Sequence, residues 1–262
     1  MQESSRLSLA RALGIVFGLA THSLFAVTVW HLVWFLAGHA PIAGGQPTTT
    51  ADQFRRLALD AGLATLFAVP HSALLLPAVR RTLSTRIVPA AFYGCFYCVV
   101  TCIALLATIL WWQPSDVVVW AWPMAVRPWI TAAFVGCWAL LLYSLHLTGL
   151  GHQTGWTPWW RWVRGLPQER REFHPRGAYS FLRHPVYLSF LGLVWFTPVV
   201  TLDRAVLIAI WTAYIFIGSV LKDRRLVFFL GDYYRAYQAR VPGYPGIPAG
   251  PLARVPVGTI RR

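Results

Sequence analysis

Ionisable and aromatic residues are concentrated in one stretch, residues 176–187, which reads R-G-A-Y-S-F-L-R-H-P-V-Y. Arg183, His184 and Pro185 stand directly before a long apolar run. Proline suits the first turn of a helix, so we expect a helix to begin at Pro185 with His184 at its cap. The free N–H groups of such a helix end bind carboxylates and other polar groups. The stretch therefore predicts a binding site, although a helix start at a membrane surface with a snorkelling arginine has the same pattern.

The overall composition indicates a membrane protein. The chain has 262 residues, of which 56% are hydrophobic and 14 are tryptophan, and its mean hydropathy is +0.52. This apolar content is above that of ordinary soluble domains. The formal net charge of +14 is high enough for a nucleic-acid-binding protein, but the basic residues form no continuous tract and no recognisable nucleic-acid motif. We therefore expect no nucleic-acid partner.

Six apolar segments predict an all-α, polytopic membrane protein with about six transmembrane helices. Most of them reach the roughly 20 residues that cross a bilayer. The fifth is short, so it is tilted, partly buried, or one half of a tight hairpin with the sixth. The apolar period of the sixth continues further along the chain, which predicts a helix as far as Gly231. The six segments are residues 12–37, 57–79, 89–112, 128–150, 186–200 and 204–221.

We expect one membrane domain, residues 1–262, with four helices in residues 1–150 and a C-terminal half in residues 151–262. The positive charges predict its orientation. With the N-terminus inside, 19 of the 23 lysines and arginines fall on the inner side, as the positive-inside rule requires. The predicted protein is therefore a multi-pass protein of the cell inner membrane with both termini in the cytoplasm. The Trp- and Arg-rich residues 158–164 are expected to lie against membrane lipid.

Titratable groups inside the apolar segments need a separate explanation. His71 follows Pro70, which is expected to kink the second helix and free a carbonyl nearby. A histidine in such a place is either a functional group or a neutral imidazole bonded to a neighbouring helix. Three cysteines share one helix face but lack the second cysteine pair or histidine pair of a metal site. The cysteines expected to be small packing residues, with neither metal nor disulfide, are Cys95, Cys98, Cys102 and Cys137.

Three motifs follow one another in the C-terminal half. They read G-x-Y-x-x-x-R-H-P-x-Y from Gly177, L-x-x-x-x-G-x-x-Y-x-x-Y from Leu226, and V-P-x-x-x-x-I-P from Val241. This order, with a helical hairpin between the first two motifs, resembles the isoprenylcysteine carboxyl methyltransferase superfamily. Upstream, L-F-A-V-P-H-S, T-R-I-V-P and W-W-Q-P are similar to the branch that contains bacterial methanethiol S-methyltransferase and the NnrU-like proteins. The resemblance covers about residues 57–248.

The resemblance implies a membrane methyltransferase with an S-adenosylmethionine pocket at the cytoplasmic face, formed by the C-terminal half. Basic side chains and helix N–H groups would bind the carboxylate of this cofactor, and aromatic side chains would stack on its adenine. Some of the residues match cofactor-contacting positions of the family directly, and the segment before them matches by its offset. The implied cofactor-binding residues are Arg171, Glu172, Phe173, His174, Tyr179, Arg183, His184, Pro185, Tyr187, Lys222 and Asp223.

The branch implies S-methylation of a small thiol, such as methanethiol to dimethyl sulfide, with the apolar acceptor entering from the bilayer. Methyl transfer is an in-line displacement, so the protein must mainly align the partners and exclude water. The thiol must also reach its thiolate form. His71 and His146 are candidate catalytic bases because they lie in apolar spans. The alternatives are carboxyl methylation of an isoprenylcysteine-like or other apolar acid, and a non-catalytic, NnrU-like membrane protein.

The chain departs from the family pattern at positions that bear on the cofactor. The family usually has two glutamates where this chain has Lys222 and Asp223, so the charge at the first position is reversed. Arg225 stands where the small-thiol branch often has an acidic residue, and His146 where it usually has aspartate. Either Asp223 takes over the role of the carboxylate with a shifted cofactor pose, or the pocket binds a different cofactor or none.

Overall fold

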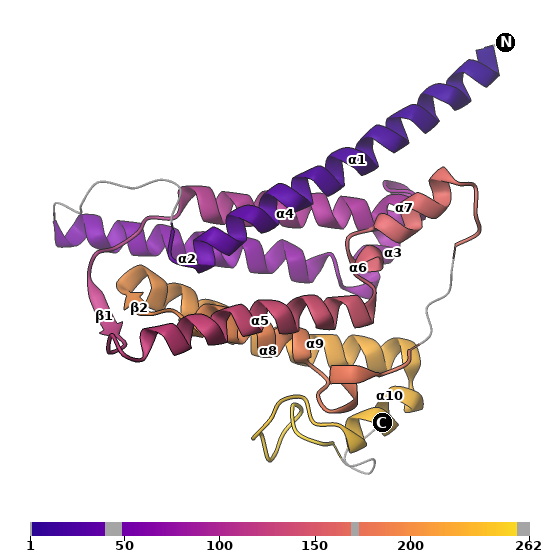
Figure 1. Ribbon diagram of the computed structural model, residues 1–262. Coiled ribbons are helices and arrows are strands. Elements are labelled where there is room, and N and C mark those ends of the chain that lie inside the picture. Colours follow the sequence, from indigo (N-terminus) through magenta and orange to yellow (C-terminus); the bar gives the residue numbers. More distant parts are fainter. Residues whose placement is uncertain (1, 40–48, 169–172, 256–262) are drawn as a thin grey trace. The chain divides into compact units, whose positions relative to one another are not determined.

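Helices dominate the fold. The computed structural model describes residues 2–39, 49–168 and 173–255, most of which are helical (Figure 1). Within these residues four helices are long and apolar enough to cross a membrane, and a fifth span results if two helices joined by a 72° bend are counted as one. The all-α, polytopic class is confirmed. The four are α1 (Gln2–Leu36), α4 (Tyr93–Trp111), α5 (Arg127–Thr148) and α9 (Leu202–Leu230), and the bent pair is α2 (Thr50–Ala73) and α3 (Pro77–Arg86).

The short fifth segment of the sequence forms α8 (Pro185–Trp195). Its 11 residues are fewer than a perpendicular bilayer crossing requires. α8 packs against α9, and strand β2 (Val199–Thr201) lies between them in the chain, so the expected helical hairpin is present. β2 pairs antiparallel with β1 (Val118–Ala121). α9 continues to Leu230 and is followed by Gly231, which has a positive φ of 55°, as the expected helix end requires.

The bend in the second apolar segment lies beyond the residue expected to cause it. α2 continues through Pro70 and ends at Ala73, and α3 begins at Pro77. The carbonyl of Pro70 accepts the N–H of Leu74 over 3.0 Å, so the helix is intact directly after the proline. Proline at a first helical position starts a new helix without losing a hydrogen bond, and Pro77 is placed in this way. The 72° bend at residues 74–76 was not predicted, and a kink at Pro70 itself stays a prediction.

The described chain divides into two compact units, each built from separate stretches of sequence. Unit 1 comprises Met1–Ile42, Thr65–Trp112 and Gly149–Glu172, and unit 2 comprises the remaining residues. The single-domain organisation, with halves at residues 1–150 and 151–262, stays a prediction. The three motifs of the C-terminal half all lie in unit 2.

Unit 1 is held together by close approach of helices at glycines. α1 packs against α4 and against α7 (Trp156–Val163), which follows the short helix α6 (Leu150–Gln153). The Trp159 indole lies on α1 so closely that a Cβ at Gly18 would be 2.0 Å from it, and its N–H donates to the Gly14 carbonyl over 2.9 Å. One tryptophan of the stretch expected at the lipid surface is thus buried within the protein. A single 3-10 turn, η1 (Ala90–Phe92), precedes α4.

Unit 2 contains α5, α8 and α9, followed by α10 (Asp232–Arg240) and the segment that reaches residue 255. α5 and α8 pack closely because α8 has a glycine at their contact: a Cβ at Gly192 would lie 2.3 Å from the Cys137 sulfur. The 3-10 turn η2 (Gly177–Ser180) packs against α5 and precedes α8 in the chain. The elements that carry the motif residues therefore belong to one packed body.

Candidate functional site

The beginning of α8 places the R-H-P residues. α8 starts at Pro185 with His184 at its N-cap, as the sequence predicts. The turn η2 before it carries Tyr179, which is buried. Gly177 opens this turn with a φ of +57°, and a Cβ there would lie 2.4 Å from the Tyr143 hydroxyl, so only glycine fits. The glycine of the first motif is thus needed for the turn that positions its tyrosine.

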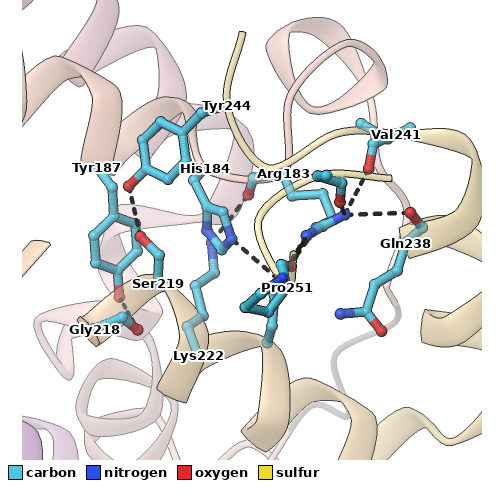
Figure 2. A network of polar contacts seen from close by, with 12 residues as sticks. Arg183, His184, Tyr187, Gly218, Ser219, Lys222, Gln238, Val241, Tyr244 and Pro251 are labelled. Atoms are coloured by element: carbon cyan, nitrogen blue, oxygen red, sulfur yellow. Dashed lines mark hydrogen bonds and ion pairs between the residues drawn. The ribbon is translucent and has the colours of Figure 1, made fainter. Parts of the chain in front are cut away.

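Arg183 is the most heavily bonded residue of the site. The residue is 1% exposed, its Nε donates to Asp223 over 3.2 Å, and its Nη2 forms an ion pair with the same carboxylate at 3.0 Å. The remaining N–H groups donate to main-chain carbonyls near the end of the described chain (Figure 2). Arginine is suited to this role because its planar fork of donors is always charged. The carbonyls are those of Gln238, Val241, Pro251 and Ala253, at 3.2, 2.8, 2.7 and 2.9 Å.

These contacts make Arg183 a positioning residue. They join the start of α8 to α9 and to residues 241–253, and the Arg183 main-chain N–H adds a bond of 2.9 Å to the Pro242 carbonyl. The donors that the sequence assigned to a cofactor carboxylate are thus directed at protein acceptors. Sequence spacing contains no sign of this, because the acceptors lie 55 to 70 residues further along the chain.

Asp223 is the buried carboxylate at the centre of the site. It is 4% exposed, and besides Arg183 it accepts the Tyr234 hydroxyl at Oδ1 over 2.5 Å. A buried charge is tolerated when it is paired and its lone pairs are bonded, and both conditions hold here. Burial and the neighbouring carboxylate raise the pKa of Tyr234, so its hydroxyl stays a donor. The nearby Tyr237 hydroxyl donates to the Tyr179 carbonyl over 2.5 Å, and burial likewise raises the pKa of Tyr237.

His184 is fully buried and incompletely bonded. Its Nε2 lies 3.2 Å from Asp223 Oδ2, but neither ring nitrogen makes a well-aligned hydrogen bond with any described residue. Burial lowers the pKa of His184, and this outweighs the opposite effect of Asp223, so the imidazole is neutral. The ring packs against Tyr187 and Tyr244, with ring centroids 5.5 Å apart in each case. A buried polar nitrogen without a partner is rare in native structures and is a candidate ligand contact.

Lys222, at the charge-reversed position, points into the site. Its Nζ donates to the Arg183 carbonyl over 3.3 Å and lies 5.5 Å from the ring centroid of Tyr179 and 5.4 Å from that of Tyr187. Figure 2 shows the lysine beside His184. The family's acidic position is thus occupied by an ammonium group between two aromatic rings.

The segment after α10 packs against the motif residues, and most of its contacts were not predicted from the sequence. Tyr244 is 3% exposed, and its hydroxyl lies 2.6 Å from the Ser219 Oγ; burial raises the pKa of Tyr244 to about 12. The Gly243 N–H donates to the Leu252 carbonyl over 2.8 Å. One sequence signal could have indicated Ser219 as a site residue. It lies three residues before Lys222 and four before Asp223 on α9, so it is on the same face of the helix.

The other sequence-predicted residues are more scattered. Phe173 packs on the rings of Tyr234 and Tyr237 at 5.4 and 5.3 Å, and His174 is exposed. Arg171 and Glu172 lie outside the described residues. The residues that the structure brings together are Tyr179, Arg183, His184, Pro185, Tyr187, Lys222 and Asp223.

The two histidines predicted as catalytic bases are not among the residues of this cluster. His71 belongs to unit 1, where the Tyr97 hydroxyl lies 3.0 Å from its ring nitrogens. His146 lies on α5 in unit 2 and is exposed. Within the described residues, no group of three or more His, Cys, Asp or Glu side chains is placed to hold a metal ion, and all four cysteines are free.

Comparison with known proteins identifies the family. The methanethiol S-methyltransferase of Pseudomonas sp. (strain GM41(2012)) is 30% identical over 236 residues, which are 87% of this chain and 88% of the relative. The chain belongs to the methanethiol S-methyltransferase family. Methanethiol S-methyltransferase 1 of Bradyrhizobium diazoefficiens is 29% identical over 234 residues, covering 87% of this chain and 80% of the relative. Nurim of Xenopus laevis is 25% identical over 189 residues, 69% of this chain and 66% of the relative. No family model and no solved structure matches the chain.

A methanethiol S-methyltransferase requires a place for a methyl donor beside a place for an acceptor. The cluster offers aromatic faces, a neutral imidazole with an unbonded nitrogen, and one ammonium group. Aromatic faces bind nucleobases and cationic groups, and an unbonded buried nitrogen accepts or donates one hydrogen bond to a ligand. The residues therefore fit a methyl donor of the nucleoside type, except that Lys222 adds a positive charge.

Proposed function

We propose that this protein is an integral membrane methyltransferase that S-methylates a small thiol, with methanethiol converted to dimethyl sulfide. The observation that carries the proposal is the state of His184: the motif histidine is fully buried and neutral, its Nε2 faces a fixed carboxylate at 3.2 Å, and its Nδ1 has no hydrogen-bond partner among the described residues. This arrangement supports handling of a proton in a dry site. It is built entirely from unit 2.

The methyl donor in this proposal is S-adenosylmethionine. Tyr179 and Tyr187 would hold it through their ring faces, and His184 would contribute its unbonded nitrogen. When bound, this cofactor supplies an electrophilic methyl group on a sulfonium sulfur. Asp223 acts indirectly, because its oxygens are engaged by Arg183 and Tyr234. This is evidence against the alternative in which Asp223 takes over the role of the family's carboxylate with a shifted cofactor pose.

His184 is the proposed proton acceptor for the thiol. Asp223 lies at Nε2, and a carboxylate there favours the tautomer with its proton on Nε2, so that Nδ1 carries the free lone pair. A thiol S–H near Nδ1 transfers its proton to that atom and becomes the nucleophilic thiolate. The positive charge of Lys222 stabilises the thiolate. Of the predicted bases, His146 is exposed and His71 lies on unit 1, so neither has this setting.

The orientation is part of the proposal. The inner side of the expected topology has 19 of the 23 lysines and arginines, which supports cytoplasmic termini and a site at the cytoplasmic face of the cell inner membrane. A small apolar acceptor then reaches the site from the bilayer, while the donor arrives from the cytoplasm. Membrane lipid is the expected surrounding partner of the exposed apolar helix faces.

The direct test is formation of dimethyl sulfide by purified protein in detergent. With S-adenosylmethionine and methanethiol both present, headspace gas chromatography should detect dimethyl sulfide in proportion to the protein added. His184→Gln should lower the rate by about 10² to 10⁴-fold if its Nδ1 accepts the proton. His146→Gln is the matched control and should keep the wild-type rate. Absence of dimethyl sulfide, with turnover of an isoprenylcysteine analogue instead, would establish carboxyl methylation as the activity.

A second candidate function is favoured by Lys222. A positive charge between the rings that would face a sulfonium cation opposes binding of the donor. A non-catalytic, NnrU-like membrane protein would have kept the fold and lost the reaction in this way. It predicts that neither S-adenosylmethionine nor its demethylated product binds to any form of the protein.

A further inference from the structure

The surroundings of the Lys222 ammonium are those of a cation-binding site. Nζ lies within 5.5 Å of two tyrosine ring centroids and 3.3 Å from the Arg183 carbonyl oxygen. Aromatic faces combined with a carbonyl attract compact cations, including onium groups of ligands, through the negative faces of the rings and the carbonyl dipole. The cation bound next to these rings is the Lys222 ammonium group of the protein itself.

The two rings are held by contacts that do not involve the lysine. Tyr179 is fixed by the Tyr237 hydroxyl, which donates to its carbonyl over 2.5 Å, and the turn that carries it requires Gly177. The Tyr187 ring lies against α9 at Gly218, where a Cβ would be only 3.3 Å from the ring. The cage is therefore formed by the fold, and Lys222 fills it as a flexible side chain on a four-carbon stem.

The charges around the cage do not cancel. Among the described residues, the carboxylate beside the cage is that of Asp223, which is engaged by Arg183 at 3.0 Å and is thereby neutralised. The Lys222 charge remains as an excess positive charge. Any second cation in the cage is repelled by it, whereas a neutral group is not. The lysine must leave the cage before another cation enters.

We propose that the Tyr179 and Tyr187 rings with the Arg183 carbonyl form a subsite for a sulfonium cation, and that Lys222 is a tethered competitor for this subsite. The inference rests on the proposed function, because it takes S-adenosylmethionine as the sulfonium ligand. Its consequence is a reversed selectivity. S-adenosylhomocysteine has lost the methyl group and the positive charge at sulfur. Both ligands must displace the lysine, but the displaced ammonium stays tethered nearby and repels only the charged donor, so Lys222 penalises the donor more than the product. Lys222 is thus a specificity-determining residue that makes the site prone to inhibition by product.

The test is a pair of calorimetric titrations on each purified variant in detergent. S-adenosylmethionine and S-adenosylhomocysteine are titrated into the wild type and into Lys222→Met, which keeps the length of the side chain and removes its charge. The ratio of the two dissociation constants should shift by at least about tenfold towards the donor in Lys222→Met, which is the size expected for a desolvated cation–π contact. Lys222→Arg keeps a cation in the cage and should keep the wild-type ratio.

Arg224→Met is the matched control, since it removes a positive charge from an exposed position two residues away on the same helix and should leave the ratio unchanged. If Lys222→Met fails to fold, Lys222→Gln replaces it, with thermal unfolding recorded for both. An unchanged ratio in folded, ligand-binding Lys222→Met or Lys222→Gln would overturn the inference and leave the proposed function standing. Absence of binding of both ligands to every variant would instead overturn the proposed function and this inference with it.

Discussion

The two units of the protein differ in where they bury charge: among the described residues, the buried charged side chains all lie in unit 2. In unit 1, Thr21 of α1 donates to the Phe17 carbonyl of its own helix over 2.8 Å, and the His22 Nδ1 lies 2.6 Å from the Gly18 carbonyl. Unit 1 also has long-range bonds between uncharged groups, such as that of the Trp159 N–H to the Gly14 carbonyl. In unit 2, Arg183 joins groups that are 40 to 70 residues apart in the chain. Local bonding leaves no need for a precise tertiary arrangement, whereas the long-range network exists only in the folded unit.

From this difference we infer that unit 1 is a scaffold and that unit 2 carries the site. Unit 1 is packed by aromatic rings on glycines and free buried cysteines, so substitutions there act on packing. Unit 2 contains the buried charges, and a change there leaves a partner unpaired in a dry environment.

The largest effect is expected from Asp223→Asn. Removal of this carboxylate leaves Arg183 buried without its charge partner and removes the acceptor of Tyr234. Loss of one partner of a buried pair costs about 3–5 kcal/mol, which thermal unfolding in detergent should show as a large fall in the midpoint. Asp232→Asn is the control, because Asp232 forms only an exposed pair with Arg235, and its midpoint should be close to the wild type. Equal midpoints for the two variants would contradict the account of the network.

The next effect is expected in unit 1 from Gly18→Ala. The new Cβ would overlap the Trp159 ring at about 2.0 Å, and overpacking of this kind costs about 1–3 kcal/mol. Gly136→Ala places the same methyl group in a helix with no atom within 4 Å and should be neutral or slightly stabilising. Nucleoside binding should be unchanged in both variants that remain folded. A folded Gly18→Ala protein that has lost binding would show that unit 1 is more than a scaffold.

An effect of similar size is expected in unit 2 from Ser219→Ala. The Ser219 hydroxyl donates to the Ile215 carbonyl over 2.8 Å, so it accepts from Tyr244. The variant leaves the Tyr244 hydroxyl buried without a partner, which costs about 1–3 kcal/mol. Adding Tyr244→Phe removes the stranded hydroxyl, so the double variant should be more stable than Ser219→Ala alone. The unfolding midpoints of the wild type, the two single variants and the double variant give the coupling between Ser219 and Tyr244. Additive losses of stability would rule out the hydrogen bond between them.

The smallest effect is a pH dependence of stability from His184. Burial lowers the pKa of His184 below its ordinary value of 6.5, so the unfolded chain binds this proton more readily than the folded protein. Stability should therefore be complete above pH 6.5 and fall as the pH drops below it, by at most about 1.4 kcal/mol per pH unit. His184→Gln should show a shallower fall of the unfolding midpoint between pH 7.5 and 5.5. A steeper fall in the variant would mean that His184 is charged in the folded protein.

The sequence was sufficient for features that depend on nearby residues. The start of α8 at Pro185 and the end of α9 before Gly231 were both predicted, because helix ends are governed by the residues at the ends themselves. The bend between Ala73 and Pro77 was not predicted, because a proline that starts a new helix and one that lies inside a helix look alike in an apolar segment.

The sequence predicted which residues belong to the site but not what each of them does there. The family motifs brought His184, Tyr187 and Asp223 into one list, and the structure places them together. The role of Arg183 as a clamp on residues 241–253 depends on contacts 58 to 70 residues away, and side-chain direction decides that Lys222 enters the cage. Neither is recorded in local sequence patterns, because both arise only when the C-terminal segment folds back.

Binding of a methyl donor to the cluster in unit 2 can be measured by ultraviolet cross-linking of radiolabelled S-adenosylmethionine to the purified protein, followed by peptide mapping. We expect saturable labelling of peptides from residues 173–190 or 215–244, with protection by excess S-adenosylhomocysteine. Saturable labelling confined to peptides of unit 1, or no protected labelling at millimolar cofactor, would contradict binding of the donor to this cluster.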